Sequence, residues 1–364
     1  MRTTARNTSA RQHTTSGLDT AQTAAKETST MTRGKEAVGL LDDLRRRRDN
    51  AQHVGKSGDH RAAAALFEGL LPLYERAWGA EHEETLAVRD GLGLWTGDAG
   101  RLADAVATLR DLLVTRERIQ GSDHPDTLYT LDSLGYFVGE SGDPAEGARL
   151  RLAALAGQER VLGPEHPDTL VTRNGAAVLI GAAGAPDRAA AMLRKLLTLR
   201  DGLAGPRDPG TLRTRHEVAR WTGAAGRPAE ARDMLEDLLP LREDVLGDEH
   251  PHALSTRHEL ARWTGETGGI DEAQARLREL LEIRRQIQGP RHHRTLETWH
   301  ELARWTYAAG RPDDAAAMLR TLIPAREHTL GPRHPHTLAS RRLLACTAPS
   351  DTPAAGALRM RPFG

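Results

Sequence analysis

Three short strings, HEVAR, HELAR and HELAR, combine the residue types of a zinc-dependent hydrolase. They begin at His216, His258 and His300. A His-Glu-x-x-His helix binds zinc because its two imidazoles lie one turn apart on one face, and the glutamate acts as general base. The second imidazole position holds arginine in this chain, at Arg220, Arg262 and Arg304. A permanently charged guanidinium does not bind zinc, so we predict no metal site at these strings.

A fourth string, HVGKSGDH, contains Gly55, Lys56 and Ser57 in the order found at the end of a phosphate-binding loop. The full motif needs a strand before it and a glycine where this chain has Asn50. Neither condition is met, because the preceding segment has the pattern of a helix and residue 50 is asparagine. No carboxylate pair and no nucleophile with an adjacent base emerges elsewhere. The sequence therefore predicts neither an enzyme nor a bound cofactor.

The candidate residues recur because the whole chain repeats. One block appears as GAEHEETL, GSDHPDTL, GPEHPDTL, GPRDPGTL, GDEHPHAL, GPRHHRTL and GPRHPHTL. The first glycine of each copy lies 42 residues after the last, at Gly79, Gly121, Gly163, Gly205, Gly247, Gly289 and Gly331. A constant period of this size is typical of stacked supersecondary units, each too small to bury its apolar face alone.

Each unit predicts two helices. The first runs from about Thr85 to Gly97, with a Thr or Asp side chain as its cap. The equivalent helices of the next copies begin at Thr127, Thr169 and Thr211. Glycines such as Gly97 and Gly100 end this helix, since glycine adopts the left-handed conformation of a helix terminus. A longer amphipathic helix follows, often with proline in its first turn. The units are therefore antiparallel helix pairs.

Two columns of the repeat are interpreted as structural. Histidines at the corner lie one repeat apart and cannot converge on one ion, so we interpret them as turn residues. They are His82, His124, His166, His250, His292 and His334. A tryptophan column, filled by plain hydrophobes in other copies, is predicted to pack between helices. It consists of Trp95, Phe137, Leu179, Trp221, Trp263 and Trp305.

The columns of large, small and turn residues resemble the tetratricopeptide repeat. The large column is Leu92, Leu134, Ala176, Val218, Leu260 and Leu302, and the small column is Gly93, Gly135, Ala177, Ala219, Ala261 and Ala303. The turn glycine, from Gly100 to Gly310, and the alanine column of the second helix, from Ala105 to Ala315, complete the pattern. The 42-residue repeat length and the sequence LGPEHPDTL resemble those of the kinesin-light-chain subtype, which is common in bacterial signalling proteins. The chain departs from the family where Thr96, Thr222, Thr264 and Thr306 replace the aromatic residue that usually closes the first helix.

This resemblance implies an all-α fold, a right-handed α-solenoid (superhelix) of about seven antiparallel helix pairs plus a terminal capping helix. We assign residues 35–346 to the solenoid. The segments 1–34 and 347–364 lack an apolar period, and we predict a disordered N-terminal tail and a flexible C-terminal tail.

The resemblance also implies that the first helices line a concave groove, which is the candidate binding site for a protein or peptide. Its candidate residues are His216, Arg220, His258, Arg262, His300 and Arg304, with Asp90, Asp132, Asn174 and Tyr136 in the matching columns of earlier repeats. Aligned arginines favour a partner that is acidic, phosphorylated or has a free C-terminal carboxylate. The alternative is that the arginines only pair with the glutamates three residues earlier, Glu217, Glu259 and Glu301.

Charge and composition limit the remaining functions. The 50 basic and 50 acidic residues balance, which disfavours nucleic acid as a partner, and no apolar run approaches a membrane span. We expect a cytoplasmic protein whose single cysteine, Cys346, forms no intramolecular disulfide. The leading interpretation is a non-catalytic adaptor in bacterial signalling. The alternatives are a regulator whose superhelix responds to a small peptide or anion and, less favoured, a nucleic-acid-binding α-solenoid.

Overall fold

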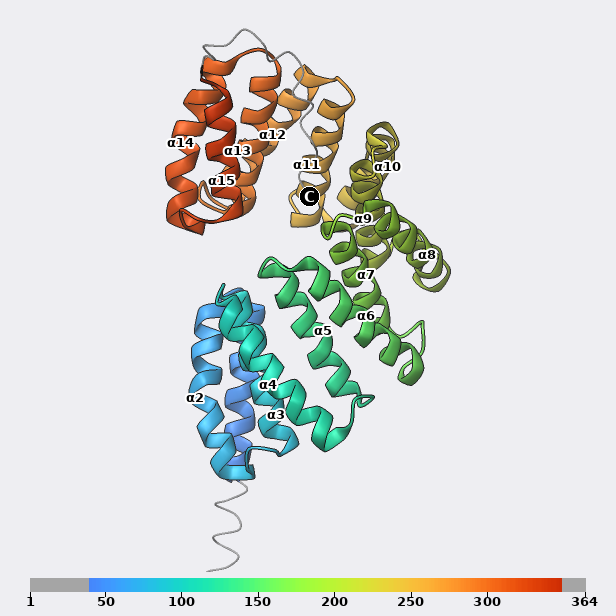
Figure 1. Cartoon of the computed structure of the whole chain (residues 1–364), viewed down its shortest axis with the longest axis vertical. Coiled ribbons are helices and arrows are strands. Elements are labelled where there is room, and N and C mark those ends of the chain that lie inside the picture. Colours follow the sequence, from blue (N-terminus) through green and yellow to red (C-terminus); the bar gives the residue numbers. More distant parts are fainter. Residues whose placement is uncertain (1–38, 349–364) are drawn as a thin grey trace, which may run out of the picture. The chain divides into compact units, whose positions relative to one another are not determined.

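A computed structural model describes residues 39–348 of the chain, and every regular element in that range is an α-helix. The two predicted tails, 1–34 and 347–364, lie outside the described residues except for 347 and 348. The all-α prediction is confirmed for the described range (Figure 1). Within that range no helix is both long and apolar enough to cross a membrane.

The described part of the chain divides after Phe137 into two compact units, residues 39–137 and 138–348. In the described part of the first unit, a helix over residues 39–56 precedes α2 (His60–Trp78), α3 (Glu83–Asp98), α4 (Leu102–Gln120) and most of α5 (Pro125–Glu140). The second unit contains α6 (Pro144–Val161), α7 (Pro167–Ala182), α8 (Pro186–Ala204), α9 (Pro209–Ala224), α10 (Pro228–Leu246), α11 (Pro251–Glu266), α12 (Ile270–Ile287), α13 (His293–Ala308), α14 (Pro312–Leu330) and α15 (Pro335–Cys346).

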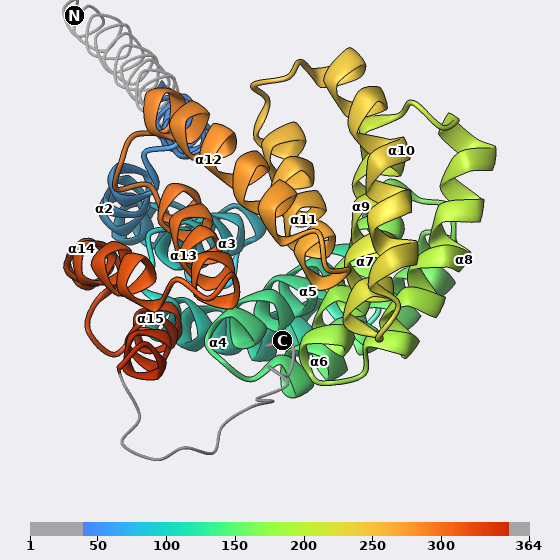
Figure 2. The same ribbon diagram turned by 90° about the horizontal axis from the view of Figure 1, so that it is seen from above.

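Helices of the second unit pack in the order of the chain, each against the next from α6 to α15. The odd-numbered helices, which are the first helices of the repeats, also contact one another from α7 to α15. Figure 2 shows α11, α12 and α13 following one another in this way. The predicted stacking of helix pairs in chain order is therefore confirmed within this unit.

The helix α10 illustrates why these segments are helical. Its buried residues Ala231, Leu235, Leu238 and Arg242 recur every three or four positions, so they share one face. Burying a leucine side chain in this way contributes about 1.5–3 kcal/mol. The same face ends on a buried arginine, which the hydrophobic pattern does not predict.

The first helices begin two residues before the predicted threonines, so that part of the prediction is wrong. In α11 the imidazole Nδ1 of His250 accepts a hydrogen bond of 3.1 Å from the backbone N–H of His252. Corner histidines cap α3, α7, α13 and α15 in the same way, and Asp208 caps α9. Thr211 is instead buried one turn inside its helix. The interpretation of the corner histidines as turn residues is confirmed.

The tryptophan column is buried, as predicted, and each ring packs on a glycine of the preceding repeat. Trp263 is 2% exposed, and a Cβ added at Gly223 would lie 2.5 Å from its ring. Equivalent pairs are Gly181 with Trp221 and Gly265 with Trp305. These glycines lie one residue before the last residue of the first helix, close to its predicted end, and they also provide room for the next repeat. The left-handed glycine is the one three residues later, such as Gly226 with φ of 87°.

The last copy of this pair has the opposite sizes. Tyr307 stands in the glycine register, and Thr347 stands where the following tryptophan would be. The glycine register therefore holds a large residue only in the repeat whose next tryptophan position is occupied by a small one. This reciprocal change within one chain supports the interpretation that the two columns pack against each other.

Candidate functional site

The predicted histidine column lies between successive first helices of the second unit. His216 on α9 is 8% exposed, and its Nδ1 lies 3.5 Å from the hydroxyl of Thr256 on α11. The same contact recurs at 3.5 and 3.2 Å between His258 and Thr298 and between His300 and Ser340. Burial, together with Arg242, lowers the pKa of His216 well below its usual value. The imidazole is therefore neutral near pH 7, and the positive charge of this surface comes from arginine.

A second arginine column lies beneath the histidines and was missed by the sequence analysis. It consists of Arg200, Arg242, Arg284 and Arg326 in the second unit and Arg116 in the first. Arg242, Arg284 and Arg326 are each 1% exposed. The signal was visible, because the arginines from Arg200 to Arg326 are 42 residues apart and Gln158 stands between Arg116 and Arg200 in the same register. Arginine is rarely buried, so the pattern alone predicts a solvated position.

Arg242, Arg284 and Arg326 each join three helices. Arg242 on α10 donates through Nη1 to the carbonyl of His252 and to the hydroxyl of Thr256, both at 2.8 Å, and through Nη2 to the carbonyl of Leu212 at 3.0 Å. Arg284 and Arg326 make the equivalent three bonds in the next two repeats. The planar guanidinium suits this role, since its donors point in fixed directions. The column therefore fixes each second helix to the first helices on either side.

The first unit provides this arginine with a carboxylate. Arg116 lies 2.8 Å from Oδ2 of Asp90, which occupies the register of the histidine column. Asp90 also accepts a hydrogen bond of 3.2 Å from the hydroxyl of Thr130. Burial raises the pKa of Asp90 to about 6, although Arg116 opposes the shift. The predicted binding residue Asp90 is thus part of a buried ion pair.

The predicted arginine column is partly exposed. The side chains of Arg220, Arg262 and Arg304 are 38%, 18% and 17% exposed. Each guanidinium lies over the ring of the tryptophan that follows it, at 4.9, 4.6 and 4.5 Å from the ring centroid. A cation over an aromatic face is held in place, which reduces the entropy lost when a ligand binds. We call the surface of α9, α11 and α13 that carries these three residues the arginine face.

The glutamates three residues earlier pair unequally with the arginine face. Arg304 donates to Glu301 at 2.7 Å and also to Glu266. Glu217 and Glu259 form longer ion pairs with Arg220 and Arg262, at 3.6 and 3.7 Å. The alternative of simple internal pairing therefore describes Arg304 better than the other two arginines.

The remaining predicted residues are divided between the two units. In the second unit, Oδ1 of Asn174 accepts a hydrogen bond of 3.4 Å from Thr214, so it continues the histidine column. In the first unit, Asp132 is partly buried. Tyr136 is 38% exposed, with its ring 4.9 Å from that of Phe137. The second unit thus brings Asn174 together with the six His and Arg residues.

Comparison with known proteins agrees with this architecture. Models of the tetratricopeptide repeat match residues 85–126, 127–168, 212–286 and 253–328, which together exceed half of the chain. The chain belongs to the tetratricopeptide repeat family. No curated protein sequence matches it.

Two solved structures with TM-scores above 0.5 show the same fold at low identity, and a third match is weaker. A tetratricopeptide repeat protein from Parabacteroides merdae is 14% identical with a TM-score of 0.56, over 84% of this chain and 99% of that one. NprR in complex with its cognate peptide NprX is 14% identical with a TM-score of 0.59, over 83% of each chain. The kinesin light chain repeats of Podosopora anserina are 28% identical with a TM-score of 0.47, over 57% of this chain and 97% of that one.

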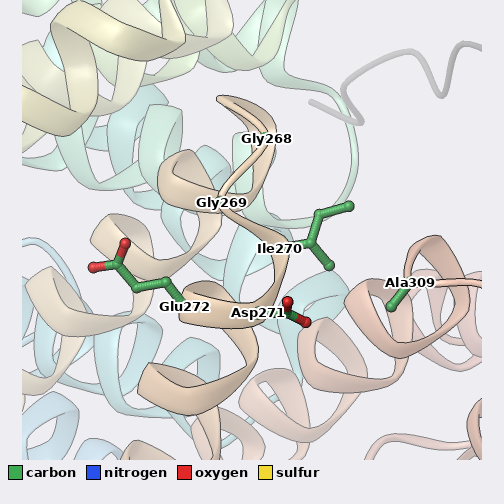
Figure 3. A pocket seen from close by; sticks show the side chains of 6 residues that line it. All are labelled: Gly268, Gly269, Ile270, Asp271, Glu272 and Ala309. Atoms are coloured by element: carbon green, nitrogen blue, oxygen red, sulfur yellow. The ribbon is translucent and has the colours of Figure 1, made fainter.

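One open hollow of the tetratricopeptide array lies at the turn between α11 and α12. Gly268 and Gly269 form its wall, with Asp271, Ile270 and Ala309 beside them (Figure 3). Glu272 points away from these residues in Figure 3 and binds Arg276 at 2.7 Å. In the part of the chain that the structure describes, no three His, Cys, Asp or Glu residues converge as a metal site. The hollow therefore offers no chemistry beyond two carboxylates in the first turn of a helix.

The buried histidines predict that the array loses stability in acid. Burial, with Arg326 as the next cause, lowers the pKa of His300 from 6.5 to about 4. In the unfolded chain this imidazole gains a proton below pH 6.5, whereas in the folded chain it does so only near pH 4. The free energy of unfolding should therefore fall between these values, by up to about 3 kcal/mol for this residue. Urea unfolding followed by helical circular dichroism at pH 7.5, 5.5 and 4.5 measures the loss.

His300→Asn is the matched variant, because Asn174 occupies the same register and does not titrate. Its free energy of unfolding should depend less on pH over this interval than that of the natural chain. Equal slopes for the two proteins would mean that the folded chain does not hold His300, which is partly buried, in its neutral form.

Proposed function

We propose that this protein is a non-catalytic scaffold that binds a segment of another protein along the arginine face. The segment carries negative charge, as an acidic stretch, a phosphorylated side chain or a terminal carboxylate. The supporting observation is the row of three arginines on consecutive first helices, each over the ring of a tryptophan. The ion pairs of Arg220 and Arg262 with their glutamates are long, at 3.6 and 3.7 Å, against 2.7 Å for Arg304.

The arrangement suits recognition of an anion. A guanidinium gives paired, charge-assisted hydrogen bonds to a carboxylate or phosphate, and these are roughly twice as strong as neutral ones. Because the rings of Trp221 and Trp263 already orient Arg220 and Arg262, little side-chain entropy is lost on binding. A protein of the same fold, NprR, has been solved with a bound peptide, which supports a peptide as the ligand class.

Affinity capture from the native host tests the proposal. The double variant Arg220→Ser, Arg262→Ser should lose most of the captured partner, since each arginine in charge-assisted contact contributes about 1.5–3 kcal/mol. Arg232→Ser on α10 is the matched control, because Arg232 binds the neighbouring Asp233 and lies on a second helix. The control should capture the partner as the natural chain does.

Circular dichroism and thermal unfolding must show that both variants are folded. If the folded double variant retains its partner at the natural level, the arginine face is not the binding surface and the proposal is wrong.

A further inference from the structure

The buried arginines of the second unit lack the carboxylates that neutralise their counterpart in the first unit. Arg116 has Asp90 at 2.8 Å and Asp126, in the first turn of α5, at 4.0 Å. In the second unit the register of Asp90 is held by His216, His258 and His300, and the register of Asp126 by His252, Arg294 and His336. Both internal anions have therefore been replaced in three consecutive repeats.

No other carboxylate takes their place at short range. In the described range of the chain, no carboxylate oxygen lies within 4.0 Å of Arg242, Arg284 or Arg326. Although burial lowers the pKa of all three arginines, Glu217 raises the pKa of Arg242, and Glu297 raises that of Arg284 and Arg326, by electrostatic attraction over a longer distance. Burying an unpaired ion is unfavourable by several kcal/mol. Three unpaired buried cations in one row thus indicate an anion that comes from outside the array.

Hydrogen bonds connect each buried arginine to the surface. Nη1 of Arg242 donates to the hydroxyl of Thr256 at 2.8 Å, and this hydroxyl lies 3.5 Å from Nδ1 of His216. In the described structure, Nε2 of His216 has no hydrogen-bond partner. The hydroxyl of Thr256 also donates to the carbonyl of His252 at 3.0 Å. When it turns to donate to Nδ1 instead, the imidazole proton is on Nε2, which becomes a donor, and an anion bound at Nε2 favours this tautomer. Arg220, one turn further along α9, lies on the same side of the helix and acts electrostatically on His216.

We propose that the ligand of the arginine face supplies these missing anions, as aspartate or glutamate side chains at every third residue of an extended segment. The inference rests on the proposed function and specifies its ligand. Each of the three repeats offers one receptor for an anion, formed by the Nε2–H of the histidine and the guanidinium four residues later. Neighbouring helices lie about 10 Å apart and an extended chain advances about 3.3 Å per residue, so one repeat corresponds to about three residues.

Fluorescent peptides measure this preference directly. The probe is three Asp-Gly-Ser triplets with a labelled N-terminus and an amidated C-terminus. One comparison peptide has the same composition with its three aspartates adjacent, a second has serine in place of aspartate, and a third has serine with a free C-terminal carboxylate. The spaced peptide should bind at least about tenfold more tightly than each of the others. Equal affinity of the spaced and adjacent peptides would contradict the three-residue spacing.

His258→Asp restores an internal carboxylate in the register of Asp90 and tests the missing anion itself. It should weaken the spaced peptide by about tenfold or more and raise the midpoint of thermal unfolding, because Arg284 gains a partner. His258→Asn keeps the register neutral, and an amide still donates, so it should weaken the peptide by only a few-fold. Ala275→Asp on the exposed side of α12 adds the same charge elsewhere and should leave binding unchanged.

The outcomes separate this inference from the proposed function. If His258→Asp binds the spaced peptide as well as His258→Asn does, the missing-anion inference is wrong. If peptides bind, and lose affinity in Arg220→Ser, Arg262→Ser, but show no preference for spaced aspartates, the proposed function stands and the inference fails. If no peptide binds and the double variant still captures the host partner, both the inference and the proposed function fail.

Discussion

Trp263→Ala should lower the free energy of unfolding by about 3–5 kcal/mol. The ring is 2% exposed and fills the space above Gly223 on the preceding first helix, with Arg262 over its face. Truncation leaves a cavity between two repeats, and an array held only by neighbouring contacts has no other element to close it. Urea unfolding monitored by helical circular dichroism gives the change in free energy.

Trp299→Ala is the control for this variant. Trp299 is partly buried and stacks with Arg285 at 5.0 Å, but no glycine of a neighbouring repeat lies beneath it. Its loss should be clearly smaller. The reciprocal change, Gly223→Ala, should be unfavourable by about 1–3 kcal/mol in the natural chain and by much less in Trp263→Ala. Additive effects of the two changes would show that the residues are not in contact.

Arg284→Ala is expected to have a comparably large effect, a loss of about 3–5 kcal/mol in the free energy of unfolding. The change removes three hydrogen bonds, to the carbonyls of Leu254 and Arg294 and to the hydroxyl of Thr298. It also leaves the volume of a buried side chain empty. The gain from no longer burying a charge offsets part of this loss but does not restore the connection between α11, α12 and α13.

Two substitutions near this site define the comparison. Arg284→Gln should lose less, because Gln158 occupies the register naturally and an amide can still donate to a carbonyl. Arg285→Ala, at the next residue, should change stability by less than about 1 kcal/mol, since Arg285 pairs with Glu282 near the surface. If Arg284→Ala were as stable as Arg285→Ala, the buried column would not hold the helices together.

The fold was accessible from sequence because a constant 42-residue spacing leaves few alternatives to stacked helix pairs. Substitution of tryptophan by Phe137 and Leu179 within the array correctly predicted that the column is buried. Repeats of one chain indicate which positions are buried, because equivalent positions have the same environment but different apolar residues.

The missed features depend on contacts between repeats. Threonine is the usual oxygen cap, so the capping Nδ1 of His250 was not expected from residue preferences. Glycine is typical of a helix end, and the sequence predicts Gly223 in that role. Only the ring of Trp263 from the next repeat shows that the missing side chain of Gly223 also leaves room for a neighbour. Arg284 is charged, and sequence pattern alone does not distinguish a buried guanidinium with three acceptors from a solvated one.

The sequence predicts the register of the arginine face but not the burial of the histidines beside it. The sequence correctly places Arg220, Arg262 and Arg304 in one register, whereas the neutral state of His258 follows from burial, which lowers its pKa. The distinction matters because a neutral imidazole contributes a hydrogen bond and not a charge to a ligand.

A photo-crosslinking residue placed on the arginine face tests the central claim most directly. Ser255 on α11 is partly exposed and lies one turn before His258, whereas Asp237 on α10 is exposed on a second helix. Irradiation in the presence of the host partner should produce a crosslink from position 255 and none from position 237. A partner that crosslinks from position 237 and not from position 255 would contradict binding along the first helices.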